Sequence, residues 1–511
     1  MTLYSLTTQS KKGFTLLGWI GLGLMFLPLF ISVTHPSWIL VTSLLFLMVG
    51  VLGYSWQQYA KQQPGIKNNG VFHRSLSARG LGGWSVGVLL TAFYIALYFY
   101  PEWLGYRTEG PSVGIIALFD PLSRILNGQA ASQWFVYGTL YSLAILVFGM
   151  KFLWKYRHSR YQQLRTLSTI FFQLIFAYLI PELLTLLHPD TPYFAKDLKN
   201  MWPLNYYFFE DWHLRNMLNG GTLGLFFFGF GVVLIFVISP LLTYRYGKRW
   251  YCSWVCGCGA LAETAGDAFR QLSSKRMSVW KLERWLIHAV LVFITLTTLA
   301  VLWSFLGSSK NPTPLSQEGF TTLSVLFFGM LFGAIWLWKR HELNADARYT
   351  LVSIGILLIG LLCIQSFSGE RQLLGISSYT VRKWYGFGIG AAFSGVLGVG
   401  FYPLLGSRVW CRFGCPMAAI LGLQQRLLSR FRITTNGGQC ISCGNCSTYC
   451  EMGIDVRSYA QKGQNIVRSS CVGCGICAAV CPRGVLKLEN GSVSNRTTAP
   501  DFPLGNLMNR S

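Results

Sequence analysis

The sequence predicts an all-α polytopic membrane bundle of about ten transmembrane helices that carries a small, cysteine-rich α+β domain at its C-terminal end. Three observations lead to this fold class. Of the 511 residues, 52% are hydrophobic and only 12% are charged, which is too apolar for an ordinary soluble enzyme. Long uncharged runs recur along the chain, each about as long as a membrane-crossing helix. Eight of the fourteen cysteines lie in one short segment near the C-terminus.

The predicted spans are apolar runs of about 17 to 25 residues. They lie at residues 13–33, 38–55, 83–100, 135–153, 166–187, 220–243, 285–305, 319–338, 350–367 and 385–405. No small-residue cleavage site follows the first run, so we expect a retained span and not a cleaved signal peptide. The chain then divides into an N-terminal membrane region of about five spans (1–215), a membrane core of about five spans (216–435), the cysteine-rich domain (436–490) and a disordered, Ser/Asn/Thr-rich tail (491–511).

The net charge of +24 reports topology and does not predict a nucleic-acid partner. Basic residues gather in alternate loops: Lys61, Lys67, Arg74 and Arg79, then Lys151, Lys155, Arg157, Arg160 and Arg165, then Arg245, Lys248, Arg249, Arg270, Lys275, Arg276 and Lys281. The opposite loops carry most of the acids, such as Glu102, Glu109, Asp120, Asp190, Asp197, Glu210 and Asp211. This asymmetry predicts a bacterial-type inner membrane protein with both termini and the cysteine-rich domain in the cytoplasm, where thiols bind metals and seldom form disulfides.

Two matching cysteine quartets carry the strongest chemical signal. Each reads C-x2-C-x2-C-x3-C, the bacterial ferredoxin run, in which three cysteines bind one four-iron cluster and the fourth reaches the other. We therefore predict two [4Fe-4S] clusters, the first on Cys440, Cys443, Cys446 and Cys481, the second on Cys471, Cys474, Cys477 and Cys450. Structural zinc is the alternative, but zinc ribbons use two separated C-x2-C knuckles. One departure is Glu451, which stands after Cys450 where proline follows Cys481.

A shorter repeat places one C-x3-C pair after the sixth span and another after the tenth. The pairs are Cys252 with Cys256 and Cys411 with Cys415, and Cys258 is a fifth thiol. On a helix, residues i and i+4 face the same side, so the pairs could supply a further metal or iron-sulfur centre. Redox thiol chemistry and a structural role are the alternatives. The basic stretches that follow, residues 260–284 and 417–432, are predicted to lie along the membrane surface or to be solvated connectors.

With these motifs in hand, residues 220–490 resemble the membrane polyferredoxins of the NapH/NosR type. Residues 411–419 (CRFGCPMAA) are similar to the second motif of that family, and residues 252–263 (CSWVCGCGALAE) to the first. The resemblance implies a bundle of spans that ends in a cytoplasmic module with two four-iron clusters. Two departures are Gly257-Cys258 where the family has proline, and the lack of an S/T-G-A-T flavin-attachment motif. No flavin is therefore predicted.

The predicted function is electron transfer through the two clusters, as a component of an oxidoreductase system. Electrons would pass between a membrane-side donor or acceptor, with quinol as the expected class, and a cytoplasmic or partner redox protein. One alternative is a redox maturation or accessory protein for a respiratory metalloenzyme, and another is a transporter with a redox-sensing domain. The aromatics Trp202, Tyr206, Tyr207, Phe208, Phe209 and Trp212 are expected to form an interfacial belt or to roof a quinone pocket.

Overall fold

The computed structural model describes residues 3–33, 35–60, 79–197, 216–217, 219–307, 315–341, 345–368, 372–373 and 376–492. Some predictions fall outside these residues. They concern the basic side chains Lys61, Lys67 and Arg74, the aromatics between 202 and 212, and the tail beyond residue 492.

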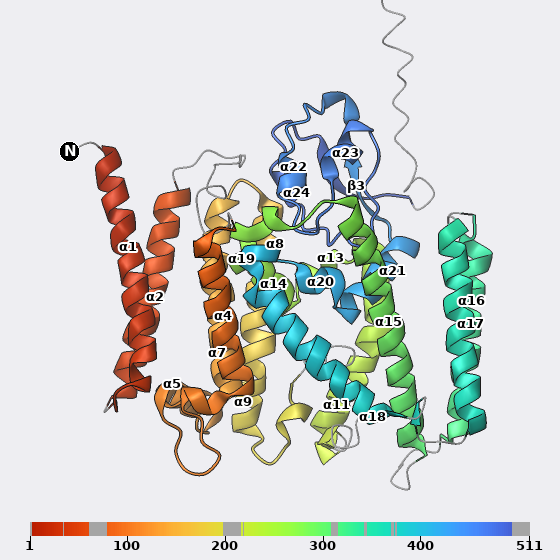
Figure 1. Cartoon of the computed structure of the whole chain (residues 1–511), viewed down its shortest axis with the longest axis horizontal. Helices are drawn as coiled ribbons and strands as arrows, with labels where there is room; N and C mark the ends of the chain where they lie inside the picture. The colour runs from red at the N-terminus through yellow and green to blue at the C-terminus, as the bar shows by residue number, and fades with distance from the viewer. Residues whose placement is uncertain are drawn as a thin grey trace, which may run out of the picture.

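Long apolar helices form a bundle with the cysteine-rich module at one end (Figure 1). Eight helices of the described chain are long and apolar enough to cross a membrane, which confirms a mostly helical, multi-pass membrane protein. They are Ser10–Leu29 (α1, Leu3–Phe26, and η1, Leu27–Leu29), Pro36–Tyr59 (α2), Leu81–Phe99 (α4), Gln133–Lys155 (α7), Arg160–Leu187 (α8, Arg160–Phe171; η4, Phe172–Leu179; α9, Ile180–Leu187), Gly221–Tyr246 (α11, Gly221–Val233; η7, Leu234–Ile238; α12, Ser239–Tyr246), Met277–Leu306 (α15) and Gln317–Trp338 (within α16, Gln317–Lys339).

The two other predicted spans are helical but are not among these eight helices. The ninth is α17 (Ala345–Ser368), whose apolar part is Arg348–Ile364. A short strand pair, β1 (Gln372–Leu373) and β2 (Ile376–Ser377), then leads to α18 (Ser378–Tyr385) and the glycine-rich π-helix η9 (Gly386–Gly400). This last helix crosses the bundle obliquely against α4, where the Tyr94 hydroxyl donates to the Ala391 carbonyl at 3.0 Å (Figure 1). The count of ten spans stays a prediction.

Short helices close the end of the bundle that lies away from the module. They are η3 (Pro101–Leu104), α5 (Gly114–Leu118), α6 (Asp120–Asn127) and η5 (Tyr193–Ala195). Ile115, Ile116 and Phe119 are 0% exposed and anchor a hydrophobic core here against the ends of α2, α4 and α7. The Ser132 side chain caps α7 by accepting from the Phe135 N–H at 3.2 Å.

A layer of short helices lies between the bundle and the module. It contains α13 (Arg249–Cys252), α14 (Gly257–Thr264), η8 (Ala265–Leu272), α19 (Tyr402–Leu405), α20 (Val409–Phe413) and α21 (Pro416–Leu427). The prediction that residues 260–284 and 417–432 lie along the membrane surface or are solvated connectors was wrong at Arg270 and Gln425. Arg270 is 0% exposed and Gln425 is 1% exposed, because the module covers both segments and their polar side chains pair within the protein.

The module is the predicted α+β fold. Strand β3 (Phe431–Thr435) pairs antiparallel with β4 (Leu486–Asn490), in a register that sets Ile433 opposite Leu488. Between the strands lie η10 (Gly437–Gln439), α22 (Asn445–Thr448), α23 (Val456–Gln461) and α24 (Ile476–Ala479). The buried–intermediate alternation along β3 turns Phe431, Ile433 and Thr435 toward the module's core.

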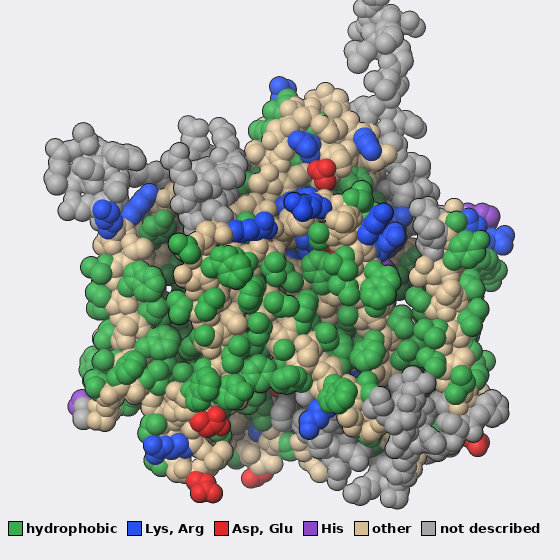
Figure 2. Space-filling view, viewed as in Figure 1, with side chains coloured by type: hydrophobic (Ala, Val, Ile, Leu, Met, Phe, Trp, Pro, Cys, Tyr) green, Lys and Arg blue, Asp and Glu red, His purple; other side chains and the backbone are tan. Residues whose placement is uncertain are grey.

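Charge is segregated along the axis of the bundle. Figure 2 shows a broad hydrophobic belt. Most of the visible Lys and Arg side chains gather at the boundary between the belt and the module, whereas most of the visible Asp and Glu side chains lie at the opposite end, together with a few Lys and Arg. The helix α1 begins at the module end, and the described chain also ends on the module (Figure 1).

Candidate metal centres

Four cysteines from the two quartets line one cavity in the outer part of the module. Cys440, Cys443 and Cys446 come from the first quartet and Cys481 from the second, and the cavity measures about 360 Å³ with its open mouth. The Cys446 thiol interacts electrostatically with the other three. Cys443 is exposed, so this group, which we call the distal set, reaches the module surface.

The other four cysteines form a second group, the proximal set, of Cys450, Cys471, Cys474 and Cys477. The Cys477 thiol interacts electrostatically with each of the other three. Burial raises the pKa of both Cys471 and Cys474 to about 11. Cys471 and Cys477 are buried and Cys450 and Cys474 are half-buried. Thiols that cannot readily ionise alone are suited to a centre whose positive metal ions stabilise thiolates. Both sets therefore fit a four-thiolate iron-sulfur cluster.

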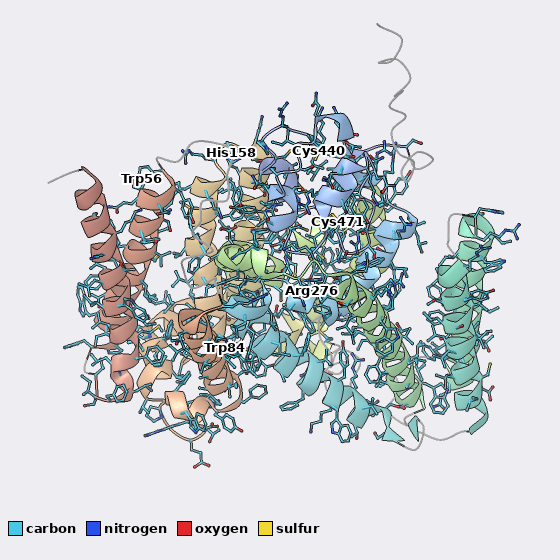
Figure 3. All side chains as sticks on the ribbon, turned by 45° about the horizontal axis from the view of Figure 1, so that its top comes forward. Trp56, Trp84, His158, Arg276, Cys440 and Cys471 are labelled. Carbon is cyan, nitrogen blue, oxygen red and sulfur yellow. The ribbon has the colours of Figure 1, made fainter. Side chains whose placement is uncertain are left out.

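The loop of the proximal set rests directly on the membrane bundle. Its backbone follows a left-handed path at Gly473 (φ +65°) and Gly475 (φ +74°), which glycine permits. The Tyr161 hydroxyl donates to the Gly473 carbonyl at 2.8 Å, and the Gln162 side-chain amide donates to the Cys474 carbonyl at 2.7 Å. His158 also lies beside the module, 3.3 Å from the Ala479 carbonyl (Figure 3).

These contacts come from α8 and the turn before it, in the cysteine-free N-terminal half of the chain. None of the predicted site residues lies in that half. The sequence feature that could have revealed these contacts is the polar and basic first part of α8, which follows an apolar span. Polar side chains at this end of a span can donate hydrogen bonds to backbone carbonyls of the module.

The two C-x3-C motifs adopt the same backbone turn. The Tyr251 carbonyl accepts from the Cys256 N–H at 2.8 Å, and the Trp410 carbonyl accepts from the Cys415 N–H at 3.0 Å. Each second cysteine then stands at the N-cap of a helix, α14 or α21. The expectation that each pair lies at i and i+4 of one helix was wrong, because Cys256 and Cys415 are extended (ψ 123° and 115°) and break it.

The turns nevertheless bring the five predicted thiols together, as the C-x3-C set of Cys252, Cys256, Cys258, Cys411 and Cys415. The Cys415 thiol interacts with those of Cys411, Cys256 and Cys252, and Cys258 interacts with Cys256, Cys411 and Cys415. Burial raises the pKa of Cys252 to about 12, whereas a hydrogen bond with Cys258 lowers the pKa of Cys256 to about 6. The helix starts at two of these positions favour negative sulfur.

Buried ions connect the C-x3-C set to the proximal set. Arg408 donates from Nη1 to the Cys252 carbonyl at 3.3 Å and lies 3.7 Å from the Cys411 Sγ. Its Nη2 is 3.0 Å from carboxylate oxygens of both Glu263 and Glu451. In the sequence, Glu451 stood out only as a departure from proline, and no role was predicted for it or for Arg408.

Comparisons with known proteins agree with this chemistry. Residues 439–486 match the family described as a 4Fe-4S dicluster domain, and residues 228–276 and 387–434 match the family described as a 4Fe-4S binding domain. The first match spans both quartets, and the second spans both C-x3-C motifs.

One curated relative is the "Putative electron transport protein YccM" of Escherichia coli (strain K12), which is 28% identical over 240 residues. The match covers 45% of this chain, which spans about half (47%) of the length of that relative. No solved structure matches the chain. The chain thus carries 4Fe-4S binding domains on a multi-pass membrane bundle, which is the organisation of an iron-sulfur electron-transfer protein.

Proposed function

We propose that the protein passes single electrons between the bilayer and a soluble redox protein, in the manner of the NapH/NosR-type membrane polyferredoxins that it resembles. The distal and proximal sets each hold a [4Fe-4S] cluster, which supplies one-electron transfer. One observation carries the proposal. The first C-x3-C turn touches the loop of the proximal set, where the Ser253 hydroxyl donates to the Val472 carbonyl at 2.9 Å.

The three thiol sets define an order of transfer. The C-x3-C set lies in the layer next to the membrane spans, the proximal set rests on that layer, and the distal set lines a cavity at the module surface. We propose that Cys252, Cys256, Cys411 and Cys415 hold a third iron-sulfur centre. Their convergence from two motifs and the 4Fe-4S family match over both motifs support this assignment.

The proposed membrane-side partner is a quinol. Cys258 is exposed and its thiol interacts electrostatically with the phenols of Tyr94, Tyr137 and Tyr141, which belong to α4 and α7. Phenolic hydroxyls can donate to a quinone oxygen and accept from a quinol. Oxidation of one quinol to quinone releases two protons and two electrons, and the electrons leave one at a time along the thiol sets.

The proposed soluble partner is an acidic electron carrier that docks over the distal set. Arg457 and Arg483 line the cavity there, and no carboxylate is among its lining residues. Ile441, on the same rim, is 53% exposed and offers an apolar contact. Complementary charge of this kind accelerates association and selects an acidic partner.

We further propose that the module and both termini are cytoplasmic, in a bacterial-type inner membrane. The gathering of Lys and Arg at the module end and of acids at the other end supports this orientation (Figure 2). The N-terminal region of α1 to α9, the membrane core and the module remain the proposed divisions, although α7 and α8 contribute contacts to the module's seat.

The test is to reduce the clusters from each side. The protein is placed in vesicles, and cluster reduction is followed by low-temperature EPR after addition of a short-chain quinol or of dithionite. The variant with Cys252→Ser and Cys411→Ser should lose reduction by quinol at least tenfold and keep reduction by dithionite. Cys363→Ser, a cysteine of α17, is the matched control and should change neither.

Equal quinol reduction in the double variant and the control would overturn the proposed route. If that variant also fails to mature a partner reductase, the C-x3-C thiols act in maturation instead.

A further inference from the structure

Seven charged side chains form a buried network between the C-x3-C set and the proximal set. We call it the Glu451 network. Its cations are Lys155, Arg165, Arg270 and Arg408, and its anions are Glu263, Asp267 and Glu451; each side chain is at most 4% exposed. The members come from α7, α8, the α14 and η8 helices that follow the first C-x3-C motif, the turn that precedes the second motif, and the module.

Glu451 is the module's own contribution to this network. Its two oxygens bind different arginines: Oε2 lies 3.0 Å from Arg270 Nη1 and Oε1 lies 3.0 Å from Arg408 Nη2. Arg270 belongs to η8, after the first C-x3-C motif, and Arg408 immediately precedes the second. A single carboxylate thus ties the module to both halves of the repeat.

The remaining ion pairs extend the network into the bundle. Arg408 Nη2 also lies 3.0 Å from Glu263 Oε1, and Arg165 pairs with the other oxygen of Glu263. Asp267 bridges Arg270 Nε at 2.7 Å and Lys155 Nζ at 2.6 Å. Four cations against three anions leave a net charge of +1 in a site closed to water.

This charge lies against a thiol of the proximal set. The ligand atoms of Glu263, Glu451 and Cys474 are all within 4.8 Å of one another. The Cys474 thiol interacts with Glu451, Arg165 and Arg270. In a buried, low-dielectric site, one unit of charge at this range strongly changes the free energy with which a nearby centre gains an electron.

We propose that Glu451 is a positioning residue that holds the proximal set against the C-x3-C set and lowers the reduction potential of a cluster bound there. The inference rests on the proposed cluster assignment. Cluster potentials respond to net charge and to burial, and a carboxylate beside the ligands opposes addition of an electron. Without the charge of Glu451, the network would hold four cations and two anions, and its net charge of +2 would favour the reduced cluster.

The choice of residue supports a role beyond stability. Proline follows Cys481 at the matching position of the other quartet, so the turn itself does not require a carboxylate. Buried ion pairs commonly stabilise a fold less than well-packed apolar side chains of similar volume. A glutamate here contributes a fixed charge and a fixed orientation, which an apolar residue would not.

The experiment is a redox titration of the full-length protein, followed by EPR, with two variants of opposite sign. Glu451→Gln should raise the potential of one cluster, so that its ratio of reduced to oxidised form changes about tenfold at fixed ambient potential, which is about 59 mV for a one-electron couple. Arg270→Gln leaves three cations and three anions and should lower the potential of the same cluster. The potential of the cluster on the distal set should not change.

Glu489→Gln is the matched control, because Glu489 is an exposed glutamate of the same module. It should leave the potential of every cluster unchanged. Shifts of equal sign in the Glu451 and Arg270 variants, or no shift in either, would overturn the inference. If Glu451→Gln does not accumulate, Arg270→Gln and the charge-balanced double variant decide, since the double variant should return the potential to that of the wild type. Absence of two cluster signals in the wild type would instead refute the proposed function.

Discussion

One of the side chains that hold the module on the bundle is Gln425 of α21. It is 1% exposed and makes three hydrogen bonds to backbone groups. Its Nε2 donates to the carbonyls of Arg468 and Cys471, both at 3.0 Å, and its Oε1 accepts from the Lys248 N–H at 2.6 Å. Removal of this amide leaves the buried Lys248 N–H, the buried Cys471 carbonyl and the part-buried Arg468 carbonyl without this partner.

The expected cost follows from those three groups. A buried polar backbone group that loses its hydrogen bond costs about 1 to 3 kcal/mol, so the two fully buried groups alone set a lower bound of about 2 kcal/mol for Gln425→Ala. Every 1.4 kcal/mol is tenfold, and the local opening of the segment around Cys471 should therefore become at least about 25 times more frequent.

Hydrogen–deuterium exchange of residues 468–474 in detergent-solubilised protein measures this opening. Gln425→Met keeps most of the volume without the hydrogen bonds and should open nearly as much as Gln425→Ala. Leu423→Ala, on the exposed side of the same helix, should leave exchange unchanged. If Gln425→Met exchanges like the wild type, packing and not hydrogen bonding holds the module, and the reasoning is refuted.

Three further predictions concern loading, the module turn and the partner surface. Burial raises the pKa of Cys471 to about 11 and of Cys252 to about 12, so these thiols are protonated at pH 7 without clusters. Cluster loading must therefore release protons and become more favourable as pH rises, and a pH-stat trace without proton release would contradict this. Gly473→Ala should lower the iron content, since Gly473 has a positive φ and a Cβ there would lie 2.8 Å from the Arg249 Cβ. An unchanged iron content would contradict this close contact between the loop of the proximal set and Arg249. Charge reversal at Arg457 and Arg483 should slow the reduction of an acidic flavodoxin at least tenfold at low salt and only a little at high salt. Equal slowing at low and at high salt would argue against docking over the distal set.

The sequence predicted the membrane class and the module because both follow from local patterns. In a bilayer, the backbone N–H and C=O groups of a long apolar run must be hydrogen-bonded within the run, which therefore forms a helix. The spacing of the quartets reflects cluster geometry. The pairing of Cys481 with Cys440, Cys443 and Cys446 around one cavity is the arrangement that this spacing implies.

The layer between bundle and module could not be predicted in the same way. Its segments combine apolar and basic residues, as surface helices do, and no local pattern reveals that Arg270 and Arg408 are buried against acids contributed by distant segments. The prediction that each C-x3-C pair lies on one helix was wrong for a related reason. Their spacing fits a continuous helix, but the chain breaks at Cys256 and Cys415 so that each second thiol starts a new one.

The most direct test is quantification of iron and acid-labile sulfide in purified protein, together with EPR of the reduced form. The proposed function predicts about twelve irons and about twelve sulfides per chain, four for each of three clusters, and about eight of each in the Cys252→Ser, Cys411→Ser variant. Equal iron content in the variant and the wild type would contradict a third centre. Fewer than about eight irons in a fully loaded wild type would contradict the central claim that the two quartets hold two four-iron clusters.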